Sequence, residues 1–390
     1  MGQDKATEGS ILIAHMADTH LRDTQYATAK RGLDFEAAFL QAVEKSCAAA
    51  DIVVLVGDIF DKPRPSARVI GQLLKADMLA RHAGKIILAV TGNHDWCAPT
   101  WLSTLFPEGA SRTSGIVPLD DDVFEFEGFV FAGVQPHNHT GFREKITDVT
   151  KRARGADVVL YHGLVTGVVP MYGGLKDPLR VDELPVAKEN KAWLLGDIHI
   201  TGYVTVDRPG GGKCLIGYPG STEMCTAAEP TEKVVPLIRL SKDAATKDGH
   251  IALDTRRFIR ATVRTDEDLD NLMRDVADDA DSHPVVVVDF ARSVPQTVNR
   301  LHSTLDVQRS VVRCYPLPSD AAVAPREGSS DAGTEQLSVD FFVSRALSDD
   351  PDLESVGLDL VARGDTDAAN IVSEMIEKRL AAAGVREEEF

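Results

Sequence analysis

Five apolar runs each lead directly into a short polar motif. The runs, in chain order, are ILIAHM, DIVVLV, IILAVT, DVVLY and AWLLG. The motifs are Asp18-Thr-His20, Gly57-Asp58-Ile-Phe-Asp61, Gly92-Asn93-His94-Asp95, Tyr161-His162-Gly163 and Gly196-Asp197-Ile-His199. Short apolar runs of this kind predict buried strands, and the carboxyl ends of parallel strands meet at one edge of a sheet. The pattern therefore predicts an α/β protein whose functional site lies at that edge.

The residue types in the five motifs suit a centre that holds two divalent cations. Such a centre needs one carboxylate that bridges the ions, together with imidazole and amide ligands that add no negative charge. Asp58 is the predicted bridge. The predicted ligands of one ion are Asp18, His20 and His199, and those of the other are Asn93, His162 and Asp197. Two ions held in this way can activate water for in-line attack on phosphorus and stabilise charge on the phosphoryl oxygens.

Further residues of the motifs have predicted supporting roles. His94 follows a ligand directly and is the predicted general acid, because it can reach the leaving oxygen without binding an ion. Asp61 closes the second motif and is predicted to fix the tautomer of the His94 ring and keep it protonated. Gly57 and Gly92 are expected where a sharp turn beside a metal leaves no room for a Cβ atom. His15 lies inside the first run and is expected to be a core histidine rather than a ligand.

The motifs resemble those of the calcineurin-like metallophosphoesterase superfamily. The segments HMADTHLRDTQYATAKRGLDFEAAFLQAV, VGDIFDKPRPSARVI, VTGNHDW and IGYPGSTE also look like those of SbcD-type nucleases. These are the bacterial and phage counterparts of the archaeal and eukaryotic double-strand-break repair nuclease. The resemblance covers roughly residues 10–240 with high specificity and the rest of the chain more loosely. It implies a β-sandwich flanked by helices, with a smaller α/β capping domain and C-terminal helices.

The resemblance also implies an activity and partners. It indicates a manganese-dependent DNA nuclease that is a 3′-to-5′ exonuclease on duplex ends and an endonuclease on single strands or hairpins. Its implied partners are an SMC-like ATPase of the SbcC type and a second copy of the chain. Carried over by position, the family's catalytic histidine falls on His94. Its metal ligands fall on Asp18, His20, Asp58, Asn93, His162, Asp197 and His199.

The last motif departs from the family pattern. The family commonly has Gly-His-x-His there, whereas this chain has Asp197 in place of the first histidine. A carboxylate makes the shell of that ion harder and more anionic, which favours manganese or magnesium over softer ions. Metal preference is therefore open at this position, although aspartate remains a competent ligand.

Four segments are expected along the chain. Residues 1–250 are the predicted nuclease domain, 251–316 the capping domain, 317–335 a flexible linker and 336–390 helices that dock on the ATPase partner. In the capping domain, RRFIRATV, HPVVVVDF and RSVVRCY are predicted strands, separated by the predicted helices DEDLDNLMRDVADD and PQTVNRLHSTL. The linker has almost no large apolar side chains. The amphipathic segments VDFFVSRAL and DAANIVSEMIEKRL must dock on a partner or fold back on the cap to bury their apolar faces.

The net charge of −18 is divided unevenly along the chain. Residues 1–250 contain 32 acidic and 27 basic residues, a balance of −5, whereas residues 251–390 contain 28 and 15, a balance of −13. DNA would therefore be bound by local basic residues and the metals rather than by a general positive field. The candidates beside the site are Arg22, Lys62 and Arg64, with a further cluster at Lys151, Arg152 and Arg154. Ordinary solvated surface stays open as the alternative for all of these except Lys62 and Arg64.

Two other functions stay open from the residues alone. One is another metallophosphoesterase, such as a phosphoprotein phosphatase or a cyclic-nucleotide phosphodiesterase. Lys62 and Pro63 argue against a Ser/Thr phosphatase, whose family has an arginine-glycine pair after the GDxxD motif. The other alternative is an inactive interaction subunit, for which Asp197 is the suspicious change.

Cysteine usage and the N-terminal segment bear on the compartment. The five cysteines are scattered and form no C-x-x-C pair, which predicts neither a disulfide framework nor a zinc knuckle. The polar N-terminal segment has no signal-peptide pattern, and no apolar run is long enough to span a membrane. The expected location is the cytoplasm of a bacterial or phage-infected cell.

Overall fold

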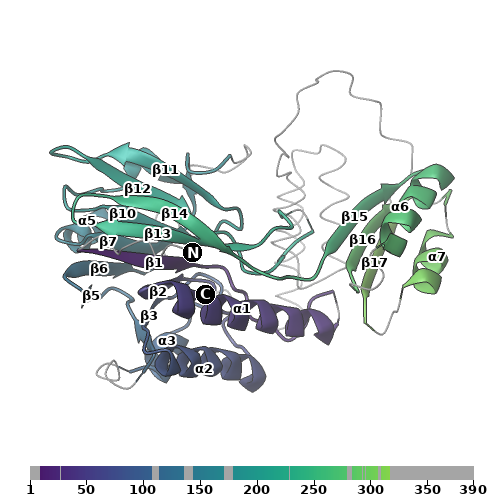
Figure 1. The fold of residues 1–390 in the computed structure, drawn as a ribbon, viewed down its shortest axis with the longest axis horizontal. Helices are drawn as coiled ribbons and strands as arrows, with labels where there is room; N and C mark the ends of the chain where they lie inside the picture. The colour runs from purple at the N-terminus through teal and green to yellow at the C-terminus, as the bar shows by residue number, and fades with distance from the viewer. Residues whose placement is uncertain are drawn as a thin grey trace, which may run out of the picture.

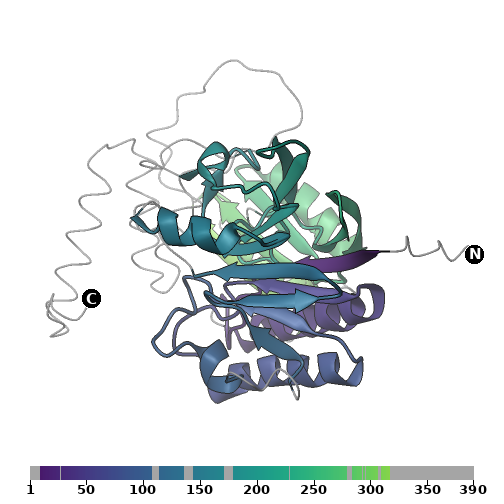
Figure 2. The ribbon, with the colours of Figure 1, turned by 90° about the vertical axis from the view of Figure 1, so that its left-hand side faces the viewer.

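The computed structural model describes residues 9–26, 28–107, 114–135, 144–170, 179–227, 229–278, 283–291, 293–294, 296–305 and 309–316. Within these residues two six-stranded sheets pack face to face, and a small three-stranded module is attached at one end (Figure 1). Helices α1 and α2 lie on one outer side of the two sheets and α5 on the other (Figure 2). The predicted α/β sandwich flanked by helices is confirmed.

The first sheet has the strand order β14-β13-β1-β2-β3-β4. Its strands are β1 (Ser10–Met16), β2 (Ile52–Val56), β3 (Ile87–Val90), β4 (Ile116–Pro118), β13 (Val234–Ser241) and β14 (Ala245–Ala252). β1, β2, β3 and β4 are parallel neighbours, with Met16 opposite Leu55 and Leu55 opposite Ala89. The first three strands therefore end level with one another, and their polar motifs leave the sheet at one edge.

The second sheet has the strand order β11-β12-β10-β7-β6-β5. Its strands are β5 (Val123–Phe126), β6 (Phe129–Val134), β7 (Val158–His162), β10 (Ala192–Gly196), β11 (Gly202–Asp207) and β12 (Lys213–Tyr218). β7 and β10 are parallel, and Gly196 lies opposite His162. Beyond this sheet, the short strands β8 (Val165–Thr166) and β9 (Leu179–Arg180) pair and lead into a 3-10 helix, Val181–Glu183.

Helices cover the outer faces of both sheets. They are α1 (Ala29–Ala49), α2 (Ala67–His82), α3 (Trp101–Leu105) and α5 (Ile146–Ala153). α1 begins after Thr28, whose side chain accepts a hydrogen bond from the main-chain N of Lys30. Phe35, Phe39 and Val43 recur at helical spacing along its buried face.

The space between the sheets is an apolar core. Ile13, Val54 and Leu88 of the first sheet meet Phe131 and Leu160 of the second, and all five are fully buried. Burial of each such side chain is worth about 1.5–3 kcal/mol. This packing holds the two sheets in fixed register, so the loops at their common edge are held in place as well.

His15 is the polar exception within β1. Its Nε2 atom donates to the carbonyl of Leu195 at 3.0 Å, and its Nδ1 atom accepts from the hydroxyl of Tyr203 at 2.8 Å. Burial lowers the pKa of His15 to about 3, so the ring is neutral. The expectation of a satisfied core histidine is confirmed.

The three-stranded module contains a parallel sheet in the order β15-β16-β17. Its elements are β15 (Phe258–Val263), α6 (Asp266–Asp278), β16 (Val285–Phe290), α7 (Thr297–Thr304) and β17 (Val311–Pro316). The valines of β16 are buried on both faces because Val286 and Val288 pack under α6 and α7, whereas Val285 and Val287 contact the cluster that contains Met224. The predicted alternation of strands and helices is confirmed.

The predicted domain boundary at residue 250 lies inside β14. β14 continues to Ala252, and Leu253 belongs to the core under α1, so the first sheet extends past the boundary expected at residue 250. The predicted linker at 317–335 and the predicted helices at 336–390 lie outside the described residues.

Candidate metal centre

The loops after β1, β2, β3, β7 and β10 bring the predicted metal ligands together. Asp18, His20, Asp58 and Asp197 have positive φ angles of 52°, 41°, 47° and 110°. Non-glycine residues in this region of conformational space each store about 1–3 kcal/mol of strain. Strain of this kind persists only where the surrounding structure enforces it, and it is typical of functional sites.

Two glycines allow the loops to approach so closely. A Cβ atom on Gly57 would lie 2.2 Å from His162 Nδ1, and one on Gly92 would lie 2.1 Å from the main-chain N of Asp58. Neither position has room for a larger residue. The predicted reason for these glycines is confirmed.

Asp58 lies at the centre of the ligand set and is fully buried. Its Oδ2 atom is 3.5 Å from His20 Nε2, and its Oδ1 atom is 3.2 Å from His162 Nε2. The main-chain N of His94 also donates to Oδ1 at 2.9 Å. The two oxygens of one carboxylate therefore face two different groups of ligands, which is the arrangement that a bridging carboxylate requires.

We call the first group the His20 half of the centre; it contains Asp18, His20 and His199. The Nε2 atoms of His20 and His199 are 3.1 Å apart, and Asp18 Oδ1 is 4.0 Å from the same His199 atom. Asp18 is also tied to the last motif, because both of its oxygens accept from the main-chain N of Asp197 at 3.1 Å. The first and last motifs thus form one side of the centre.

We call the second group the His162 half; it contains Asn93, His162 and Asp197. His162 Nδ1 donates to the carbonyl of Val56 at 2.8 Å, which leaves Nε2 to bind an ion. That Nε2 atom is 3.0 Å from Asn93 Oδ1 and 3.9 Å from Asp197 Oδ1. Burial alone would lower the pKa of His162, but the nearby Asp58 raises it to about 10. The surrounding oxygens therefore favour positive charge at this position.

The residues present fit a pair of divalent cations. Among the described residues, His20 Nδ1 and Asp58 Oδ2 are buried side-chain atoms without a hydrogen-bond partner. Donor atoms also gather within 4.8 Å of one another in three groups, which are His20, His199 and Cys225; His20, Asp58 and His94; and Asp18, Asp58 and His162. Imidazole, carboxylate and amide donors are the ligands used by manganese, zinc and iron in such centres.

Glu229 supports the centre and was missed by the sequence analysis. Its Oε1 atom accepts from His199 Nδ1 at 2.8 Å, which fixes the tautomer that leaves Nε2 free for an ion. Burial would raise the pKa of Glu229, but Lys233 at 2.7 Å and His199 hold it well below its usual range. The sequence does contain a signal, because the four-residue spacing of Glu229 and Lys233 suits an ion pair. Both residues lie far from the five motifs in the sequence, so this spacing did not point to the metal centre.

Asp95, the last residue of the third motif, was assigned no role. Its two oxygens accept from the main-chain N of Ile59 at 3.1 Å and of Gly92 at 2.9 Å. The carboxyl thereby ties the loop after β2 to the loop after β3. Burial raises its pKa to about 7.

The contact between Asp61 and His94 differs from the expected one. His94 Nδ1 donates to the main-chain carbonyl of Asp61 at 3.0 Å, so the backbone sets the tautomer. The Asp61 carboxylate instead binds Arg22 at 2.6 Å and lies 3.8 Å from His20 Nδ1. The group that faces His94 Nδ1 is thus a main-chain carbonyl, which carries no full charge. The structure does not show the predicted stabilisation of a protonated His94 ring by the Asp61 side chain.

The three predicted DNA-binding residues have different surroundings. Arg22 is largely buried, because its guanidinium binds Asp61, stacks at 4.4 Å over the ring of Phe35, and donates to the carbonyl of His20. Its contacts position the His20 half of the centre. Lys62 and Arg64 lie exposed on the loop beside the centre, as expected.

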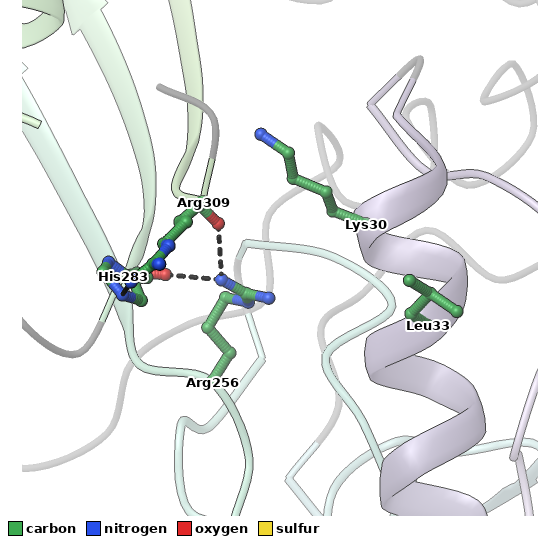
Figure 3. Close-up of a pocket in the computed structure, with 5 residues that line it drawn as sticks. All are labelled: Lys30, Leu33, Arg256, His283 and Arg309. Atoms are coloured by element: carbon green, nitrogen blue, oxygen red, sulfur yellow. Dashed lines mark hydrogen bonds between the residues drawn. The ribbon is translucent and has the colours of Figure 1, made fainter. Parts of the chain in front are cut away.

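A second basic site lies between α1 and the three-stranded module. A cavity of about 270 Å³ is lined by Lys30, Leu33, Arg256, His283 and Arg309 (Figure 3). Arg256 links the three-stranded module to α1. It donates to the carbonyls of His283 and Arg309, which flank strands of the module. It also binds both carboxylate oxygens of Asp34 in α1, at 2.8 and 2.9 Å. Lys30 donates to the carbonyl of Ser310 at 3.1 Å. We call this cavity the basic pocket.

The fold and the site define a class of protein. Two stacked sheets with histidine, aspartate and asparagine ligands at their common edge are the features of a metal-dependent hydrolase that cleaves phosphate esters. Residues 11–201 match the family described as calcineurin-like phosphoesterase. This part of the chain is therefore similar to a calcineurin-like metallophosphoesterase domain.

Several proteins with similar sequences carry the name DNA double-strand break repair protein Mre11. That of Archaeoglobus fulgidus is 26% identical over 322 residues, which is 74% of this chain and 70% of that protein. That of Methanosarcina mazei is 24% identical over 66% of this chain and 40% of that protein. That of Halobacterium salinarum is 28% identical over 63% of this chain and 61% of that protein. The matched part of the chain thus spans between 40% and 70% of these relatives.

None of the helices within the described residues is long and apolar enough to cross a membrane. All five cysteines lie within the described residues and are free thiols there.

Proposed function

We propose that this protein is a two-metal DNA nuclease of the SbcD type that trims DNA ends during repair and recombination. The observation that carries the proposal is the position of Asp58, whose two oxygens face the His20 half and the His162 half. The three relatives described above, which are named as DNA double-strand break repair proteins, support DNA as the substrate.

The cofactor in this proposal is a pair of divalent cations, with manganese preferred and magnesium as the alternative. The residues that would hold them are Asp18, His20, Asp58, Asn93, His162, Asp197 and His199. When bound, two such ions make water a better nucleophile and neutralise charge on the phosphoryl oxygens. The chain's own contribution is to fix the ligands before substrate arrives, through Glu229 behind His199 and the carbonyl of Val56 behind His162.

His94 is the proposed general acid. Its Nδ1 atom is engaged by the carbonyl of Asp61, so Nε2 is the atom that would transfer a proton to the leaving oxygen. The ring lies 4.9 Å from that of His20, and one of its nitrogens belongs to a group of donor atoms with His20 and Asp58. Residues in this position can reach a phosphate bound at the centre.

DNA would be held by local basic residues. Lys62 and Arg64 lie beside the centre, and the basic pocket would take a backbone phosphate farther along the duplex, where the three-stranded module acts as the capping domain. Arg22 would act indirectly, through its contacts with Asp61 and the carbonyl of His20. We further propose 3′-to-5′ exonuclease activity on duplex ends, endonuclease activity on single strands and hairpins, and a homodimer.

The proposed partner is an SMC-like ATPase of the SbcC type, bound through residues 336–390. Deletion of these residues is expected to abolish binding of the ATPase while manganese-dependent DNA cleavage by the remaining chain continues. Binding that survives the deletion would place the docking site elsewhere.

The substrate assignment can be tested by comparing three substrates under one set of conditions. The purified chain is incubated with manganese and end-labelled linear duplex DNA, a phosphopeptide or a cyclic nucleotide, with Asp58→Ala as the control for contaminating enzymes. We expect the wild-type chain to release mononucleotides from DNA and the variant to release none. Hydrolysis of the phosphopeptide or the cyclic nucleotide without DNA cleavage would overturn the proposal of a DNA nuclease. It would still agree with a hydrolytic metal centre.

A further inference from the structure

Cys225 lies beside the metal centre, although the motifs did not point to it. Its sulfur and ring nitrogens of His20 and His199 all lie within 4.8 Å of one another. It follows β12, on a segment that folds back over the edge where the motifs meet. None of the four other free cysteines belongs to such a group within the described residues.

The two histidines of this group are arranged for a cation. Their Nε2 atoms are 3.1 Å apart, and their rings are almost fully buried. His199 cannot turn away, because its Nδ1 atom is held by Glu229 at 2.8 Å. His20 Nδ1 is buried without a hydrogen-bond partner among the described residues. Two converging imidazole nitrogens of this kind favour a shared positive ion.

Glu229 positions the cysteine as well as the histidine. Its Oε2 atom accepts from the main-chain N of Cys225 at 3.2 Å, whereas its Oε1 atom holds His199. Lys233 and Ser221 bind the same carboxylate, at 2.7 and 2.8 Å, so Glu229 is itself fixed. One buried anion therefore sets the position of two donors, which is how outer residues normally orient metal ligands.

The distances allow the sulfur to coordinate. Zinc lies about 2.0–2.1 Å from imidazole nitrogen and about 2.3 Å from thiolate sulfur, so two such ligands can be up to about 4.4 Å apart. The sulfur and the two ring nitrogens lie no more than 4.8 Å from one another, so their separations are close to this range.

We propose that Cys225 is a ligand of the ion held by His20 and His199; this inference rests on the proposed two-metal centre. On binding, the sulfur–hydrogen bond breaks, the proton leaves to solvent, and a sulfur–metal bond forms. The thiol then gives up its 3.7 Å contact with the carbonyl of Glu223. The His20 half thereby gains a soft donor, whereas Asp197 makes the His162 half harder. The two halves would then differ in their donor atoms: manganese can occupy both, and the His20 half would bind thiophilic ions such as zinc or cobalt more tightly than the His162 half.

Cobalt(II) provides a direct spectroscopic test. The full chain is freed of metal with a chelator and titrated with cobalt, as wild type, Cys225→Ser and Cys97→Ser. Cys97 is the matched control, because it is also a free thiol near the motifs but belongs to none of the metal groups of the described residues. Cobalt bound to protein ligands absorbs in the visible range, and a cobalt–thiolate bond adds a charge-transfer band in the near ultraviolet.

The expected result is a charge-transfer band in the wild type and in Cys97→Ser, and loss of that band in Cys225→Ser with the visible bands retained. Visible bands without a charge-transfer band in the wild type would overturn the role of Cys225 and leave the metal centre intact. A band that survives in Cys225→Ser would also overturn it, because another thiol would then be the ligand. Absence of all cobalt bands would instead refute the metal centre on which the inference depends.

Discussion

The metal centre and the three-stranded module follow opposite structural rules. At the centre, four ligands have positive φ angles and charged side chains are buried beside one another. In the module, β16 is a run of valines packed on both faces, and its charged residues lie mostly at the surface. Residues of the candidate site thus adopt strained backbone conformations and bury charge, whereas residues of the module follow the usual preferences of strands and helices.

The stability of the sandwich is what allows this contrast. Its apolar core fixes the ends of β1, β2, β3, β7 and β10, and the loops carry strained residues because those ends do not move. The module buries one face of its sheet under its own helices and the other against the cluster that contains Met224. The contrast predicts that changes at the centre affect activity strongly, and that changes at the boundary with the module affect it weakly.

The largest effect is expected at Asp58. Asp58→Ala removes the carboxylate whose two oxygens face both halves, so both ions should be lost and activity with them. Metal content per chain after gel filtration in manganese checks this outcome. Two ions still bound to the variant would refute the bridging role.

His94 should separate chemistry from metal binding. His94→Ala is expected to keep both ions and to lose about 10²–10⁴-fold in turnover, because only proton transfer is removed. Single-turnover cleavage of a labelled duplex, together with metal analysis, measures both quantities. Unchanged turnover would remove His94 from the mechanism.

Substitution of Glu229 tests whether the residue that hydrogen-bonds to a metal ligand is needed for metal binding. Glu229→Gln keeps the shape of the side chain but weakens the hold on His199, so metal affinity should fall by about 10–100-fold. The variant should also be less stable, because Lys233 loses its buried partner. Metal titration of the folded variant, with thermal unfolding as the control for its integrity, gives the result; unaltered affinity would show that His199 needs no such partner.

Substitution of His15 tests whether a buried polar residue away from the centre has only a structural role. Its pKa of about 3 in the folded chain lies below the value of 6.5 expected on unfolding, so the unfolded chain binds a proton that the folded chain does not. Its contribution to stability is complete above pH 6.5 and is lost as the pH falls toward 3. His15→Gln should therefore show a smaller loss of unfolding free energy over this range, with unchanged metal content. An identical pH dependence in the two chains would contradict the account.

The smallest effect is expected at the boundary with the module. Arg256→Ala removes the partly exposed ion pair with Asp34, which should lower stability by about 1 kcal/mol and loosen the module. Limited proteolysis after Leu253 and denaturant unfolding are the measurements. Arg239→Ala is the matched control, because its ion pair with Asp248 joins two strands of one sheet. Equal proteolysis of both variants would show that Arg256 does not tie the module to α1.

Much of the fold was visible in the sequence, because apolar runs and turn residues mark strands wherever they occur. The five runs before the motifs are strands, and the alternation after residue 257 is the module. The end of β14 at Ala252 was not predicted, since the strand ATKDGHIA is largely exposed and has no apolar pattern. Pairing with β13, and not its own composition, makes it a strand.

The site was visible only in part. The seven predicted ligands do gather at one edge, because polar residues at strand ends stand out against apolar runs. Glu229 and Cys225 could not be found in this way, since they reach the centre on a segment that returns from β12. The roles of Asp61 and Arg22 depend on the turn after β2, where a main-chain carbonyl faces His94 and the Asp61 carboxylate turns to the guanidinium. Backbone direction in a turn is not encoded in residue type.

The most direct test of the account is anomalous diffraction from crystals of the wild-type chain soaked in manganese. The account predicts two manganese peaks per chain, one on each side of the Asp58 carboxylate, with one beside His20 and His199 and the other beside Asn93 and His162. A single peak, or peaks that do not share Asp58, would contradict it.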